Sequence, residues 1–180
     1  MSKPFFIAMA GLPGSGKSAL AARLAAALPA VILNKDTVRA AVFPPPETKY
    51  TSAQDDFILS LMYQAAEWYL RKGGNVIIDG RTFTQRVQRV ELQKAAEKAG
   101  GYLRIIYCYA PDEVIRSRLE MDVAADMHPA KDRNFDLYLR RKASMDLIEE
   151  PHLQLNTNAS LEELEEKALA WLKLSNNQNP

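Results

Sequence analysis

Three glycines followed by Lys-Ser mark residues 11–18, which read Gly-Leu-Pro-Gly-Ser-Gly-Lys-Ser and match the pattern G-x-x-x-x-G-K-[ST] at every required position. An apolar run, residues 5–10, precedes this segment, and an alanine-rich stretch with leucines at four-residue spacing, residues 17–28, follows it. We therefore expect a buried strand, a tight turn and a helix in this order. The glycines let successive backbone N–H groups point inwards, and the helix adds its positive end at the same point. The turn is thus predicted to bind phosphate groups.

In this motif the lysine reaches the β- and γ-phosphates of a nucleotide, and the serine hydroxyl binds Mg²⁺. Lys17 and Ser18 occupy these two positions. The predicted nucleotide-binding residues of this segment are Gly11, Leu12, Pro13, Gly14, Ser15, Gly16, Lys17, Ser18 and Ala19. The alternative is a glycine-rich turn whose lysine binds no ligand.

Strands alternate with helices along the rest of the chain. Strands are expected at residues 5–10, 31–33, 76–78, 102–109 and 153–155. Helices are expected at residues 17–28, 37–42, 51–71, 84–98, 135–149 and 160–171, and after Pro111. This alternation predicts an α/β fold with a parallel sheet and helices on both faces, in a single domain over residues 1–174. Residues 122–134, which mix charges without periodicity, are predicted to form a mobile loop, and residues 175–180 a disordered tail.

Composition excludes several classes of protein. The chain of 180 residues has 23 Lys and Arg against 22 Asp and Glu, a net charge of +1, which argues against a broadly basic nucleic-acid binder. Its single cysteine, Cys108, forms no internal disulfide or CxxC pair, so a reducing cytoplasm is expected. No apolar run approaches the ~18 residues that span a bilayer, so no membrane association is expected. His128 and His152 lack partners at metal-ligand spacing, so no zinc site is expected.

Two carboxylates follow predicted strands. Asp79 comes directly after the apolar residues 76–78, where it would orient Mg²⁺-bound water or contact substrate; the alternative is a cap on the turn before Gly80. Asp36 follows the second strand, and Arg39 lies three residues later on the same helix face. Asp36 is predicted to accept a proton from an attacking hydroxyl and Arg39 to bind a polar or anionic part of the acceptor. The alternative, compatible with the first, makes Asp36 a helix N-cap and leaves Arg39 solvated.

Two groups of basic residues accompany these carboxylates. The first lies before, within or just after the predicted loop: Arg116, Arg118, Lys131 and Arg133. Arginines on a closing flap stabilise the charge of a phosphoryl-transfer transition state; the alternative is a solvated helix face. The second group, Arg81, Arg86 and Arg89, follows Asp79 and would line an acceptor site or a solvent-exposed surface.

With these elements in this order, residues 5–172 resemble small P-loop kinases, the group that contains chloramphenicol phosphotransferase, zeta-toxin kinases and the kinase domain of polynucleotide 5′-kinases. The resemblance implies a three-layer α/β/α P-loop NTPase fold with a five-stranded parallel sheet of order 2-3-1-4-5, as in nucleoside monophosphate kinases. It implies that Asp36 is the general base and Arg39 binds the acceptor. Arg118 would lead into a lid over residues 122–134 and Arg133 would lie on it.

The resemblance also places the loop 156–158, and Thr157 within it, near the adenine. The chain departs from the group at two points. Many relatives carry a basic residue one helical turn after the position of Arg118, where this chain has Asp122, and residues 80–82 read Gly-Arg-Thr instead of Ala-Thr-Asn. Because of these departures, the resemblance does not indicate which role each lid arginine has or which acceptor is phosphorylated.

The sequence therefore predicts an ATP-dependent kinase that transfers the γ-phosphate to a hydroxyl of a small molecule, with ATP and Mg²⁺ as cofactors. The predicted catalytic residues are Lys17, Asp36, Arg118 and Arg133. Ser18 and Asp79 are predicted to hold Mg²⁺, and the predicted acceptor-binding residues are Asp36, Arg39, Asp79 and Arg81. A polynucleotide 5′-hydroxyl kinase and a nucleotide-binding switch with slow ATPase activity are the alternatives. The sequence does not indicate an oligomeric state.

Overall fold

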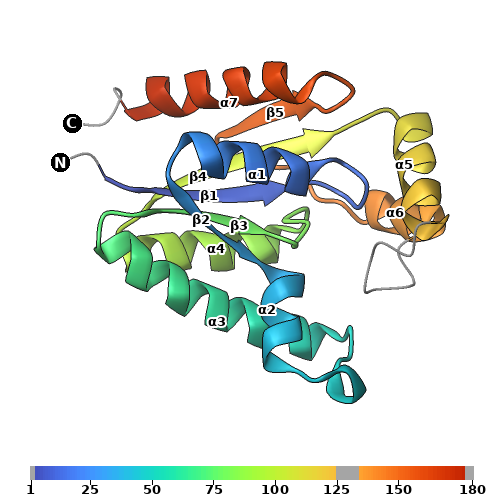
Figure 1. Ribbon diagram of the computed structural model, residues 1–180, viewed down its shortest axis with the longest axis horizontal. Coiled ribbons are helices and arrows are strands. Elements are labelled where there is room, and N and C mark those ends of the chain that lie inside the picture. The colour runs from blue at the N-terminus through green and yellow to red at the C-terminus, as the bar shows by residue number, and fades with distance from the viewer. Residues whose placement is uncertain (1–2, 125–133, 177–180) are drawn as a thin grey trace.

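The computed structural model describes residues 3–124 and 134–176, and its centre is a five-stranded parallel sheet of order β2-β3-β1-β4-β5 (Figure 1). The strands are β1 Phe5–Ala10, β2 Ala30–Asn34, β3 Asn75–Asp79, β4 Tyr102–Tyr109 and β5 His152–Asn156. β1 lies at the middle, with Ile7 opposite Ile77 of β3 and Arg104 of β4. The strand order and the three-layer α/β/α fold expected from the sequence are confirmed.

Helices cover both faces of this sheet (Figure 1). They are α1 Lys17–Ala27, α2 Lys35–Val42, α3 Ser52–Arg71, α4 Arg86–Ala99, α5 Asp112–Ala124, α6 Phe135–Ala143 and α7 Leu161–Asn176, with a short 3₁₀ turn, η1, at Pro45–Glu47. The helices α1 and α7 pack on one face, and α3 and α4 pack on the other. None of the helices within the described ranges is both long and apolar enough to cross a bilayer.

Alternating side chains of β1 divide the core between these two layers. Phe5, Ile7 and Met9 pack towards α1 and α7, whereas Phe6 and Ala8 pack towards α3 and α4. All six residues of the strand are buried, as expected of a central strand covered on both sides. This burial fixes the position of the carboxyl end of β1, from which the glycine-rich turn departs.

The helix expected over residues 135–149 ends at Ala143, so its predicted length is wrong. Contacts with the start of α4 hold the following segment, residues 144–150, in a non-helical path. The backbone N–H of Asp146 donates to the carbonyl of Thr84 over 2.9 Å, and the Asp146 carboxylate accepts from the backbone N–H of Arg86 over 2.7 Å. These tertiary contacts outweigh the local preference for helix.

The predicted lid and tail are only partly covered by the described ranges. α5 continues to Ala124, so residues 122–124 at the start of the predicted lid are helical. Residues 125–133, which include Lys131 and Arg133, lie outside the described residues. α7 continues to Asn176, two residues into the expected tail, and residues 177–180 lie outside the described ranges.

Cys108 lies in β4 with its side chain fully buried in the core that faces α1 and α7. Burial raises the pKa of its thiol to about 11. Because the thiolate is the reactive form, the thiol stays protonated near pH 8. We expect the native protein to resist iodoacetamide at that pH and the unfolded protein to take up the label, as measured by mass spectrometry. Rapid labelling of the native protein would contradict the burial of this side chain.

Candidate active site

The glycine-rich turn leaves β1 through a backbone conformation that requires glycine. Gly11 has φ +138°, and a Cβ at this residue would lie 2.3 Å from the carbonyl oxygen of Cys108. The N–H of Gly11 donates to the carbonyl of Thr82 over 2.8 Å, which ties the turn to the loop after β3. Gly16, the N-cap of α1, has no side-chain cap, so the first N–H groups of the helix are available to a ligand. Their orientation favours an anion at this point.

Lys17 begins α1, and its side chain folds back over the turn. The Lys17 ammonium donates to the carbonyl of Leu12 over 2.8 Å and to the hydroxyl of Ser15 over 3.3 Å. These bonds hold the positive charge within the turn, although the residue is almost fully buried. The turn, the helix end and the lysine together form a cradle whose shape and charge fit a chain of phosphates.

Asp79 ends β3 with a buried carboxylate that has one oxygen unsatisfied. Its Oδ2 accepts a hydrogen bond from the Asn34 side-chain amide over 2.8 Å, whereas Oδ1 is buried and has no partner among the described residues. A buried polar atom without a partner is costly, which points to a bound water or ion there. No group of three or more His, Cys, Asp and Glu side chains in the described part of the chain is arranged to hold a metal.

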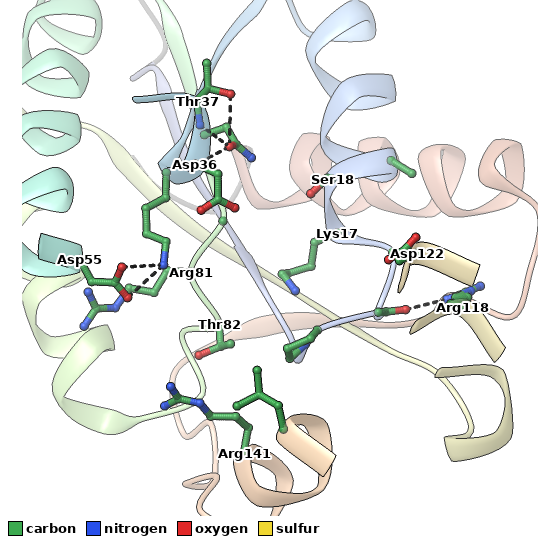
Figure 2. Close-up of a pocket in the computed structure, with 18 of the residues that line it drawn as sticks. Lys17, Ser18, Asp36, Thr37, Asp55, Arg81, Thr82, Arg118, Asp122 and Arg141 are labelled. Atoms are coloured by element: carbon green, nitrogen blue, oxygen red, sulfur yellow. Dashed lines mark hydrogen bonds and ion pairs between the residues drawn. The ribbon is translucent and has the colours of Figure 1, made fainter. Parts of the chain in front are cut away.

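A single cleft of about 1270 Å³ unites most of the predicted residues (Figure 2). The predicted residues that line it are Pro13, Gly14, Gly16, Lys17, Ser18, Ala19, Asp36, Arg81, Arg118 and Thr157. Gly11, Leu12, Ser15, Arg39 and Asp79 are not among the residues that line it. Pockets for one small ligand measure about 300–1,000 Å³, so this cleft is large enough for a nucleotide and an acceptor together.

The Asp36 side chain lines this cleft and does not cap α2, because Asn34 is the N-cap of that helix. The Asn34 side chain accepts the backbone N–H groups of Asp36 and Thr37 over 3.0 Å and 3.1 Å, so Asn34 is the N-cap of α2. The alternative assignment of Asp36 as the N-cap is therefore wrong. Figure 2 shows the Asp36 carboxylate and the Lys17 side chain on different elements that border the same space. A carboxylate there is positioned to take a proton from a bound hydroxyl.

Arg39 is almost fully buried, so the alternative of a solvated side chain is also wrong. Its guanidinium binds the carboxylate of Asp55 and lies 3.4 Å from that of Asp36. The Lys35 ammonium reaches both oxygens of Asp55 over 3.0 Å. Asp55, at the start of α3, thus joins two cations of α2, and sequence reasoning missed both Asp55 and Lys35. No sequence spacing predicts that residues of α2 and α3 form ion pairs with each other. The only sequence feature that pointed to Asp55 was that two acidic residues, 55 and 56, are adjacent.

Arg118 connects the glycine-rich turn with the loop after β5. Its guanidinium donates to the Gly14 carbonyl over 3.3 Å and to the hydroxyl and carbonyl of Thr157 over 2.9 Å and 2.8 Å. The structure therefore brings the predicted Arg118 and Thr157 together at the turn. Arg116 points elsewhere, with its guanidinium 3.9 Å from the Phe135 ring centre.

The three basic residues that follow Asp79, namely Arg81, Arg86 and Arg89, lie in different environments. Arg81 lines the cleft, where its guanidinium binds Asp56 over 3.1 Å, and Arg86 is exposed. Arg89 is buried and does not line the cleft, so neither the acceptor-site assignment nor the surface assignment of this residue is correct. It donates to the Glu150 carboxylate over 2.7 Å and to the carbonyls of Phe83 and Leu147. The cleft is completed by residues that sequence reasoning did not single out, among them Thr37, Tyr50, Ser52, Gln85 and Arg141.

Solved structures with this fold include three kinases. A provisionally assigned kinase from Chloroflexus aurantiacus has a TM-score of 0.75 and 20% identity, over 96% of this chain and 98% of that one. The APS kinase of Mycobacterium tuberculosis has a TM-score of 0.72 and 18% identity, over 96% and 99%. A gluconokinase from Sinorhizobium meliloti has a TM-score of 0.70 and 19% identity, over 98% and 96%. At these identities the likeness establishes the fold.

Sequence comparison gives a family as well. A search of curated protein sequences finds no match. The family model AAA_33, described as an AAA domain, matches residues 6–144, a range that contains the glycine-rich turn, Asp36, Asp79 and Arg118. The chain therefore belongs to the AAA_33 family and has the fold of P-loop kinases.

Proposed function

We propose that this protein is an ATP-dependent kinase that transfers the γ-phosphate of ATP to a hydroxyl group of a small molecule. The main support is the single cleft that Lys17 and Asp36 both line, because it joins a phosphate cradle to a candidate proton acceptor. The similar solved structures named as kinases agree with this proposal. ATP use also favours a cytoplasmic location.

The nucleotide half of the cleft supplies binding and charge neutralisation. Backbone N–H groups of residues 11–18 and the Lys17 ammonium would bind the phosphates. Ser18 and Asp79 would hold Mg²⁺, and the buried Oδ1 of Asp79, which has no partner among the described residues, supports this role for Asp79. Mg²⁺, when bound, neutralises charge on the phosphate oxygens. Thr157 borders this half from the loop after β5.

The acceptor half supplies the base. Asp36 accepts the hydroxyl proton as the acceptor oxygen bonds to the γ-phosphorus and the bond from phosphorus to the ADP oxygen breaks. Arg118, and Arg133 of the predicted lid, offset the negative charge that spreads over the transferring group. Arg39 and Asp55 hold Asp36 and its helix in place, and Arg81 borders the acceptor.

Two other activities have less support. A polynucleotide 5′-kinase would need a basic groove for the nucleic-acid strand, and the chain carries a net charge of only +1. A nucleotide-binding switch would have no need for a carboxylate facing the phosphate cradle across the cleft.

Lys17→Ala tests the proposed function. We expect the variant to lose ATP turnover and Mg²⁺-ATP binding, because it removes the cation inside the phosphate cradle. Calorimetry with a non-hydrolysable ATP analogue, together with a turnover assay, measures both effects. Lys94→Ala, an exposed lysine on α4, is the matched control. Unchanged nucleotide affinity in a folded Lys17→Ala protein would refute the proposal.

A further inference from the structure

The acceptor half of the cleft contains a group of ion pairs, which we call the acceptor wall. They are Lys35–Asp55, Arg39–Asp36, Arg39–Asp55 and Arg81–Asp56. One pair lies within α2, two join α2 to the start of α3, and the fourth joins the loop after β3 to α3. Every one of these side chains except that of Arg39 lines the cleft. The charge of the surface that contacts an acceptor therefore depends on which side chain of each ion pair is the more exposed.

In every pair of the acceptor wall the carboxylate is the more exposed partner. The cations Lys35, Arg39 and Arg81 expose 13%, 1% and 13% of their side chains. The carboxylates Asp36, Asp55 and Asp56 expose 25%, 30% and 61%. The cations are thus more buried than the carboxylates with which they pair, and the carboxylate oxygens are the more accessible charged atoms of each pair.

This layering favours one kind of chemical group over another. Hydroxyl groups donate hydrogen bonds to carboxylate oxygens, and those oxygens keep their ion pairs while accepting them. An anionic group would meet like charges at short range, which costs binding energy, and it would have to displace a carboxylate to reach Arg39 or Lys35. Arg141 of α6 adds one exposed cation at the far side of the cleft from Asp36 (Figure 2).

An aromatic surface adjoins the acceptor wall. Tyr50 lines the cleft with 44% of its surface exposed, and the Arg39 guanidinium lies 4.9 Å from its ring centre. The hydroxyl-bearing residues Thr37 and Ser52 line the same cleft. An apolar ring face beside hydrogen-bond acceptors fits a compound that has C–H groups on one side and hydroxyl groups around its edge.

The geometry points to an uncharged, hydroxyl-rich acceptor of the polyol or carbohydrate class, bound by the carboxylates of the acceptor wall and by Tyr50. This inference rests on the proposed kinase function and deepens it. One hydroxyl of the acceptor gives its proton to Asp36 and receives the phosphoryl group, and neighbouring hydroxyls donate to Asp55 and Asp56. A carboxylate or phosphate on the same carbon skeleton is disfavoured.

A panel of matched acceptors tests the inference. Alditols and neutral aldoses are compared with the aldonates and sugar phosphates of the same carbon skeletons, each with Mg²⁺-ATP, and mass spectrometry detects the phosphorylated product. We expect kcat/KM to be at least about tenfold higher for the uncharged member of a pair. Equal or better use of the anionic member overturns the inference.

Failure of the inference and failure of the proposed function give different results. If the panel compounds stay unmodified while an oligonucleotide or another hydroxyl compound is phosphorylated, the acceptor class is wrong and the kinase function stands. If the protein binds no Mg²⁺-ATP, or phosphorylates no acceptor of any class, the kinase function fails and the inference fails with it.

Asp56→Asn tests the acceptor wall directly. Asp56 is its most exposed carboxylate, and the change removes the negative charge that pairs with Arg81 while nearly keeping the size of the side chain. We expect the preference for uncharged over anionic compounds, measured as the ratio of their inhibition constants or KM values, to fall by about tenfold. Glu91→Gln, an exposed carboxylate on α4, is the matched control and leaves the ratio unchanged. An unchanged ratio in Asp56→Asn overturns the role of the wall.

Discussion

Asp36→Asn is expected to lower kcat for phosphoryl transfer by at least about a hundredfold while Mg²⁺-ATP binding stays within about twofold. Asparagine has nearly the size of aspartate but cannot accept the hydroxyl proton as a carboxylate does. The helix should keep its start, because Asn34 caps α2 through the backbone N–H of residue 36 and not through its side chain. Arg39 would also keep its ion pair with Asp55.

Single-turnover transfer and calorimetry with a non-hydrolysable ATP analogue separate these two effects. Glu47→Gln is the matched control, because it makes the same carboxylate-to-amide change at an exposed residue of η1 that does not line the cleft. It should leave kcat unchanged. Transfer by Asp36→Asn at the wild-type rate would show that another group takes the proton.

Arg89→Met is expected to lower the free energy of unfolding by about 3 kcal/mol and Tm by about 10 °C. The guanidinium is buried and binds Glu150, the Leu147 carbonyl and the Phe83 carbonyl. Methionine fills part of the space but leaves both carbonyls without a donor. Phe83 is a buried non-glycine residue with φ +50°, and its carbonyl loses the bond that helps to hold this unfavourable backbone conformation.

Chemical denaturation and thermal unfolding followed by circular dichroism measure the loss. Arg86→Met is the control, since Arg86 is exposed on the same helix and its contact with Asp146 uses only the backbone N–H. Its effect should stay within about 0.5 kcal/mol. Equal stability of Arg89→Met and wild type would mean that the buried ion pair adds nothing to the fold.

The parts of the site that depend on nearby residues could be predicted from the sequence. The turn at residues 11–18 follows from glycines at fixed spacing between a buried strand and a helix, and Asp79 follows from an apolar run that ends in a carboxylate. The fold class follows from the alternation of strands and helices. Each of these predictions depends on residues that are close together in the sequence, within one helix or strand or in two consecutive ones.

The missing parts depend on pairs that meet only after the helices pack. Lys35 and Asp55 are 20 residues apart, and Arg89 and Glu150 are 61 residues apart. Neither pair has a sequence spacing that identifies it. For the same reason the end of α6 was misplaced: residues 144–150 have no strong local signal against helix, and their path is set by α4.

The acceptor wall derives nearly all of its side chains from one continuous stretch of chain, from the end of β2 to the first turn of α3, with Arg81 as the addition from elsewhere. The phosphate cradle uses none of that stretch. Acceptor specificity can therefore change, in evolution or by design, through exchange of residues 35–56 as one segment. Nucleotide binding by the phosphate cradle would stay the same. Grafting residues 35–56 from one protein of this fold into another would therefore transfer the acceptor specificity.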